Sequence, residues 1–186
     1  MARGVPLRRR VILPMATVSI AIAACAPGSA VTTRSCPETI STSDLTLQQS
    51  YAEFKRSIES GPFARHLTQP LSCEARVDDG SIRLVYQSSK GDKLEAQRER
   101  AIEATETRLT SRGLSENTGL ALLQRTEHWA FGEKGCSIAW QKAPDREAGP
   151  TPDSRELVYR GDDCNCQGRL VYSGNTLTSL SFRSAC

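Results

Sequence analysis

The side chains with the widest chemical range in this chain of 186 residues are its 7 cysteines. Two of them form the motif Cys164-Asn165-Cys166, and a C-x-C pair on a strand points both sulfurs to one side. Such a pair suits a disulfide, a redox centre or half of a metal site. Because there is no C-x-x-C motif and neither His66 nor His128 lies near the pair, we favour structural disulfides and expect no metal.

No recognisable motif indicates nucleophilic or acid-base catalysis. The chain lacks G-x-S-x-G, P-loop, dinucleotide-binding and H-E-x-x-H patterns, and its two histidines stand in no nucleophile motif. Paired carboxylates for glycoside cleavage stay open, because sequence spacing does not give the distance between two acids. We therefore predict no catalytic residue and no cofactor, and we place a protein that is not an enzyme ahead of a hydrolase.

Residues 1–24 have the layout of a signal peptide. Residues 1–10 carry four arginines and no acid, and residues 11–24 are apolar apart from one threonine and one serine. The apolar run is shorter than the roughly 18 residues that cross a bilayer as a helix. It ends in Ile22-Ala23-Ala24-Cys25, which resembles the lipobox of bacterial lipoproteins. The resemblance covers residues 1–25 and implies cleavage before Cys25, lipid on that cysteine, and nothing about the mature domain.

Cysteine counting favours lipidation over ordinary cleavage at Ala21-Ile22-Ala23. Setting Cys25 aside leaves an even set, and an exported protein rarely keeps an odd thiol. That set is Cys36, Cys73, Cys136, Cys164, Cys166 and Cys186. In an oxidising compartment it predicts three disulfides. One arrangement joins Cys164 to Cys186, Cys166 to Cys136 and Cys36 to Cys73, and the other pairings stay open.

The lipoprotein resemblance also implies a location. In bacteria with an outer membrane, Asp after the lipidated cysteine favours the inner membrane, and here the residue is Ala26. We expect a domain anchored to the cell envelope by its lipid, on the outer membrane and facing the periplasm. In a single-membrane organism it lies on the outer face of that membrane. Arg9-Arg10 loosely resembles a twin-arginine signal, so the export route stays open.

The net charge of +3 comes from the signal peptide. Removing its four arginines from the 24 basic residues leaves 20 against 21 acidic ones, a net of −1. No basic patch remains, so we expect no nucleic-acid partner. The partners we expect are the membrane, through the lipid, and an unidentified envelope protein or cell-wall component.

Two helices are predicted in a single domain over residues 45–186, behind a flexible tether over residues 25–44 that is rich in Ala, Pro, Gly, Ser and Thr. The first helix begins near Leu45, with a capping box at Thr46 and Gln49, and ends at Gly61-Pro62. The second runs from Asp92 to Arg112 and has a thin apolar stripe. Its remaining charges read as a solvated face: Glu95, Glu99, Glu103, Glu106, Arg98, Arg100 and Arg108.

Three hairpins and a strand complete the predicted elements. The hairpins pair residues 73–77 with 81–87, 126–131 with 136–141, and the strands on either side of a three-residue loop at 173–175. The single strand covers residues 155–160. The second hairpin exposes His128 and groups Trp129, Phe131 and Trp140 as core or as a ligand platform. The last one gathers Cys164, Cys166, Leu170, Tyr172, Leu180, Phe182 and Cys186 on one face.

The fold class is therefore α+β, with two helices on an antiparallel sheet of about six or seven strands, stabilised by disulfides. Leu-Val-Tyr occurs at 84–86, 157–159 and 170–172, which indicates shared strand chemistry ahead of an old duplication. Arg160-Gly161-Asp162 reads as a tight turn rather than an adhesion motif. For function we rank a non-enzymatic binding or assembly role first. An inhibitor of an enzyme such as a lysozyme, with residues 143–154 as its reactive loop, comes next, followed by a hydrolase of envelope polymers.

The anchor is testable by mass spectrometry of the mature protein. We expect a chain that begins at Cys25 and carries the added mass of the lipid, because the lipobox places cleavage at that bond. A Cys25→Ala chain should lack the lipid and leave the membrane fraction. An unmodified N-terminus on either side of Cys25 in the wild type contradicts the prediction.

Overall fold

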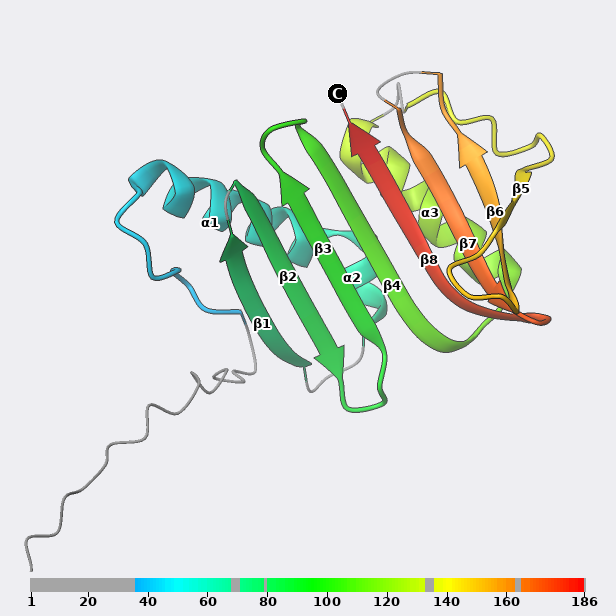
Figure 1. Cartoon of the computed structure of the whole chain (residues 1–186), viewed down its shortest axis with the longest axis horizontal. Coiled ribbons are helices and arrows are strands. Elements are labelled where there is room, and N and C mark those ends of the chain that lie inside the picture. Colours follow the sequence, from blue (N-terminus) through cyan, green and yellow to red (C-terminus); the bar gives the residue numbers. More distant parts are fainter. Residues whose placement is uncertain (1–35, 68–70, 79, 133–135, 163–164, 186) are drawn as a thin grey trace, which may run out of the picture.

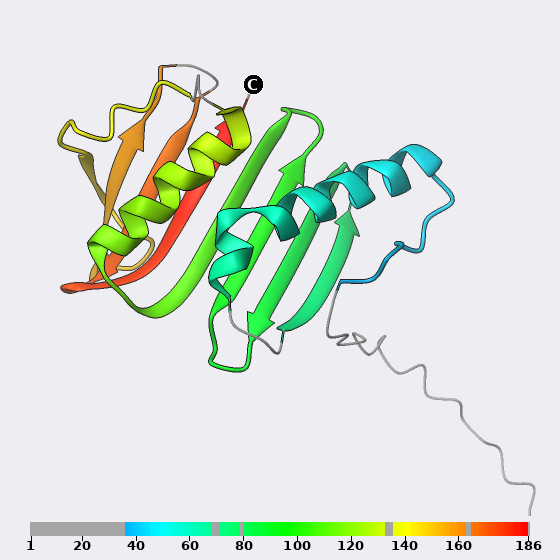
Figure 2. The same ribbon diagram turned by 180° about the vertical axis from the view of Figure 1, so that it is seen from behind.

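A computed structural model describes residues 36–67, 71–78, 80–132, 136–162 and 165–185. Three helices lie on one face of an eight-stranded antiparallel sheet (Figures 1 and 2). The predicted α+β class is confirmed, with one more helix and a slightly higher strand count than expected. Cys25, the signal peptide and the pair Cys164 and Cys186 lie outside the described residues.

The helices are α1 (Leu45–Ser60), α2 (Pro62–His66) and α3 (Glu116–Phe131). The strands are β1 (Leu71–Asp78), β2 (Ser81–Ser88), β3 (Lys93–Glu99), β4 (Ala104–Leu114), β5 (Asp145–Ala148), β6 (Ser154–Arg160), β7 (Gln167–Ser173) and β8 (Thr176–Ala185). Across the sheet they follow the order β1-β2-β3-β4-β8-β7-β6-β5.

Helix α1 forms where its apolar spacing predicts it, with Tyr51, Phe54 and Ile58 buried against the sheet. Its N-cap is Asp44, whose side chain accepts a hydrogen bond from the Leu47 N–H at 3.0 Å, rather than the predicted Thr46. The helix ends before Gly61, as predicted, and α2 begins immediately at Pro62. A proline suits the first turn of a helix, because a backbone N–H at that position has no acceptor within the helix and its absence costs no hydrogen bond.

The described chain is built from two similar halves. Each has helix first and then a four-stranded meander: α1, α2 and β1 to β4, followed by α3 and β5 to β8. β4 and β8 pair antiparallel in the middle of the sheet, with Leu109 opposite Leu180. From this pair, one row of buried side chains continues toward each edge of the sheet. It passes through Leu94 and Tyr86 in the first half and through Leu170 and Leu157 in the second. The halves are thus related by a pseudo-two-fold axis perpendicular to the sheet.

The three Leu-Val-Tyr tripeptides lie in β2, β6 and β7, and the leucine and tyrosine of each are buried. Although β2 and β6 are equivalent strands of the two halves, Leu157 corresponds to Tyr86 and not to Leu84. The tripeptides are therefore out of register. Shared strand chemistry accounts for them, and the topology is what indicates duplication.

The predicted second helix is wrong, because residues 92–112 form β3, a turn and most of β4. Leu94 and Ala96 are buried and alternate with Glu95 and Gln97, which is the two-residue period of a strand. Asp92 does not cap a helix. Its carboxylate accepts a hydrogen bond from the Ser111 hydroxyl at 2.8 Å across the β3–β4 pair.

The predicted hairpin over residues 126–141 is also wrong. Residues 126–131 are the last turns of α3, which Ser115 caps by accepting from the Thr118 N–H, and residues 136–141 contain no strand. Six residues of alternating polarity resemble either structure, and Leu122, Leu123, Thr126 and Glu127 are buried at helical spacing. Trp129 is consequently 40% exposed on the helix rather than part of an apolar sheet face.

The last hairpin reaches the predicted faces through a different turn. Its loop contains two residues, with Ser173 opposite Thr176, and a bulge between Val171 and Tyr172 then shifts the register by one residue. The shift places Leu170 opposite Leu180 and returns the apolar side chains to one face. The apolar side chains of this hairpin thus share one buried face, as predicted, but a bulge and not a longer loop brings them there.

Disulfides join Cys36 to Cys73 and Cys136 to Cys166, as in the arrangement suggested by the sequence. The first binds the N-terminal segment to β1. Residues 36–44 were expected to belong to the tether, but they lie against α1: the Tyr51 hydroxyl donates to the Pro37 carbonyl at 2.7 Å, and Lys55 pairs with Glu38 at 2.8 Å. Residues 36–44 are therefore part of the packed domain.

A buried carboxylate fixes the chain between α3 and β5. Glu127 is 7% exposed, and its Oε1 accepts from the N–H groups of Cys136 at 2.8 Å and Ile138 at 3.3 Å. Its Oε2 accepts from the Trp140 indole N–H. The Trp140 ring lies against Gly168, where a Cβ would come within 2.5 Å of it. Trp140 thus contributes to the core, as the sequence suggested, but from a loop.

We expect Glu127→Ala to destabilise the fold by about 3 kcal/mol, because it removes three hydrogen bonds to a charged group and leaves their donors without partners. Glu127→Gln should lose less stability than Glu127→Ala, because its amide keeps one oxygen acceptor. It should still be less stable than wild type, because its NH₂ group would face the indole N–H. Urea unfolding measures both changes. Gln124→Ala, an exposed change on the same helix, is the control, and an equal loss there contradicts the role of Glu127.

Candidate binding face

No helix of the described chain covers the face of the sheet opposite α1 to α3, and over β1 to β4 this face is open (Figure 1). In a pleated sheet, residues directly opposite across the strands share a face, so the register sorts the side chains into rows. One row on the open face we call the arginine row. It runs through Arg76, Arg83, Gln97, Glu106, Arg183, Gln167 and Arg160, from β1 to β6.

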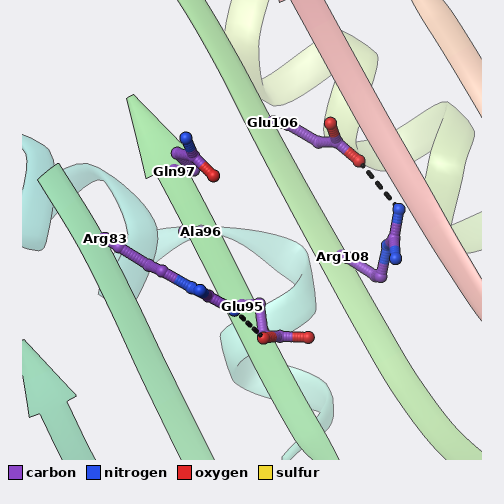
Figure 3. A pocket seen from close by; sticks show the side chains of 6 residues that line it. All are labelled: Arg83, Glu95, Ala96, Gln97, Glu106 and Arg108. Atoms are coloured by element: carbon purple, nitrogen blue, oxygen red, sulfur yellow. Dashed lines mark hydrogen bonds and ion pairs between the residues drawn. The ribbon is translucent and has the colours of Figure 1, made fainter. Parts of the chain in front are cut away.

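A shallow groove follows the middle of the arginine row. It consists of two hollows of about 160 Å³ and 60 Å³ that share Gln97 and Glu106. The larger is also lined by Arg83, Glu95, Ala96 and Arg108, and the smaller by Glu99, Ala104 and Arg183. The charged and amide side chains of the larger hollow come from β2, β3 and β4 (Figure 3). The groove therefore offers both hydrogen-bond donors and acceptors.

Ion pairs organise the larger hollow. Glu95 accepts from Arg83 at 2.7 Å and from Lys93 at 3.0 Å, while Arg108 donates to Glu106 at 3.2 Å (Figure 3). Burial raises the pKa of Glu95, but hydrogen bonds and charge from Lys93 and Arg83 outweigh it, so its pKa is lowered from the ordinary value. A general acid for glycoside cleavage needs the opposite shift. Glu95 is thus suited to holding Arg83 in place.

The two histidines do not form a site. His66 ends α2 and His128 is exposed on α3, and within the described residues neither imidazole makes a hydrogen bond or ion pair. No group of three or more His, Cys, Asp or Glu side chains in the described part of the chain is placed to hold a metal ion. The predicted exposure of His128 is correct, although it lies on a helix rather than on a hairpin.

The loop proposed as an inhibitory segment is partly a strand. Within residues 143–154, β5 pairs with β6, and the Arg160 guanidinium binds Asp145 at 3.1 Å and also Glu147. The Ser154 hydroxyl closes the remaining turn by bonding the N–H and carbonyl of Thr151 at 2.8 and 2.7 Å. Residues 145–148 of this segment are therefore held in a strand, and residues 151–154 form a closed turn.

The tripeptide Arg160-Gly161-Asp162 is structural, as the sequence suggested. Arg160 is the last residue of β6, and its side chain is held by the acids of β5. A Cβ on Gly161 would lie 2.3 Å from the carbonyl oxygen of Cys136. Glycine is therefore required here by close packing of two backbones.

The sequence did not indicate the groove. Glu95, Glu99, Glu106 and Arg108 were assigned to the solvated face of a helix, and Arg183 to the polar side of the last hairpin. The sequence predicts that these side chains are polar and solvent-facing, but not which of them lie next to one another across the strands. The strand alternation of residues 93–99 was the signal that could have corrected the assignment.

No family model, no curated protein and no solved structure matches this chain. Of the helices in the described ranges, none is both long and apolar enough to span a bilayer.

We expect Arg83→Ala to weaken the pH dependence of stability in the acid range. Because the pKa of Glu95 is lower in the folded chain than its ordinary value of 4.5, its charge stabilises the fold above about pH 4.5, and that contribution is lost as pH falls through the lowered pKa. The variant should lose less stability than wild type as the pH is lowered from neutral to below 4.5 in urea titrations. Arg112→Ala, an exposed arginine on β4, is the control, and an unchanged Arg83→Ala profile contradicts the assignment.

Proposed function

We propose that this chain is a lipid-anchored protein of the bacterial cell envelope that binds a protein partner through the open face of its sheet and catalyses no reaction. The observation that carries the binding role is the helix-free face with its polar groove across β2, β3, β4 and β8. Antiparallel sheets commonly leave one face to solvent, but a recessed row of charges on it is a surface that a partner can recognise.

The envelope location is supported by two independent features. The lipobox-like segment before Cys25 supplies the export signal and the anchor, and the two disulfides within the described chain suit an oxidising compartment. Cys36, which is buried, follows the proposed anchor by 11 residues in the sequence.

A hydrolase of envelope polymers has less support than a binding protein. Three carboxylates line the groove: Glu95 and Glu106 are each paired with an arginine, and Glu99 accepts a hydrogen bond from the Gln97 amide at 3.1 Å. The pKa of Glu95 is lowered where an acid catalyst needs it raised. The inhibitor hypothesis stays a prediction, and residues 145–148 of its candidate segment form β5. Binding is the function that uses the groove as it is built.

Site-specific photo-crosslinking in intact cells tests the binding face. A photoreactive amino acid replaces Gln97 in the groove or, as a matched control, Gln124 on the exposed side of α3. We expect a protein adduct from position 97 and none from position 124, because only the open face contacts the partner. The adduct should disappear in Cys25→Ala cells, where the domain is not held at the membrane.

Two outcomes contradict the proposal. Equal adducts from positions 97 and 124 would mean that the open face is not the contact surface. Release of soluble fragments from purified peptidoglycan by the wild-type protein would show that the chain is an enzyme.

A further inference from the structure

We propose that the partner is recognised through an acidic peptide segment that lies across the strands along the arginine row. The inference rests on the binding role proposed above and adds the chemistry of the partner. It is carried by three features of the open face: arginines that face each other, an arginine without a partner among the described residues, and ion pairs exposed enough to exchange.

Two arginines of the row face each other. Arg76 on β1 lies directly opposite Arg83 on β2, on the same face of the sheet. Like charges in this position repel, and here Glu74 and Glu95 each pair with one of the two arginines and offset that repulsion. A partner carboxylate bound between the two guanidinium groups would add a favourable contact to each of them.

Arg183 is the second feature. Its guanidinium makes no hydrogen bond or ion pair with the described residues, although it lines the smaller hollow beside Glu99 and Glu106. Glu106 is directly opposite Arg183 across β4 and β8, but the Glu106 carboxylate bonds to Arg108 instead. The groove therefore ends in a cation that is available to an incoming carboxylate.

The remaining arginines of the groove are held only by exposed ion pairs. The side chains of Arg83 and Arg108 are 50% and 47% exposed in their pairs with Glu95 and Glu106. Pairs of this kind contribute about 0–1 kcal/mol, so a partner carboxylate can take the place of the internal one at little cost. Arg76 likewise forms an exposed ion pair, with Glu74 on its own strand.

A peptide fits the row better than a sugar chain or a nucleic acid. In the row, the Gln97 amide donates to Glu99 and the Gln167 amide accepts from Arg169, which leaves the Gln97 oxygen and the Gln167 NH₂ to pair with peptide groups. The residues of the row include no aromatic ring on which a sugar or base could stack. From β1 to β6 the row spans roughly 29 Å, which is the length of about nine extended residues.

Fluorescence anisotropy with labelled peptides tests the inference on the full-length Cys25→Ala chain, which needs no membrane. The probe is a nine-residue oligoglutamate, compared with an oligolysine of equal length and with inorganic polyphosphate. We expect binding of oligoglutamate alone, weakening as salt is raised. Arg183→Gln should raise the Kd about tenfold, the loss expected for a hydrogen bond between charged groups. Glu106→Gln should lower it, because it removes a repelling carboxylate and releases Arg108.

The control is Arg125→Gln on the exposed side of α3, which makes the same change of charge on the opposite face and should leave the Kd unchanged. Circular dichroism checks that each variant is folded. An equal loss in Arg125→Gln, tighter binding to polyphosphate than to oligoglutamate, or no binding to oligoglutamate overturns the inference. Because the assay contains no lipid, it can fail while the anchor stands, or succeed while the anchor fails.

Discussion

The pairing of β4 with β8 is the contact on which the rest of the structure depends. It joins two halves that are each a helix and a meander, and it places Leu109 against Leu180 at the centre of the buried face. Without it, each half would expose a long unpaired strand and half of its core to water. The small α2 packs against α3 and closes the same seam on the helix side.

The symmetry of that pairing also explains why one face is open. A two-fold axis perpendicular to a sheet exchanges its ends and leaves its faces where they are, so α1 and α3 both fall on one side (Figure 2). The opposite face then carries mostly polar side chains, apart from Val158 and Val171, which are buried on it in the second half. In the second half, β5 and the loop before it cover Val158, whereas the region around Gln97 in the first half has no such cover.

Local signals in the sequence predicted part of this fold. The turn residues before Ser81, the apolar spacing of α1 and the even count of cysteines without Cys25 predicted a hairpin, a helix and disulfides, because each depends on neighbouring residues or on simple counting. The count left the pairings open. The helix predicted over residues 92–112 was wrong because capping residues and alternating charges suit both a surface helix and a solvated sheet face. The groove could not be predicted from the sequence, because it depends on the strand register that places Glu106 opposite Arg183, and these residues lie far apart in the chain.

The disulfide between Cys36 and Cys73 has a mechanical consequence. Any pull on the N-terminal chain enters the domain at Cys36 and passes through a covalent bond directly into β1, bypassing α1. Because β1 is an edge strand hydrogen-bonded along its length to β2, the force reaches a ladder of bonds rather than the frayed end of a helix. Tension would therefore load the edge of the sheet first and leave the β4–β8 centre for last.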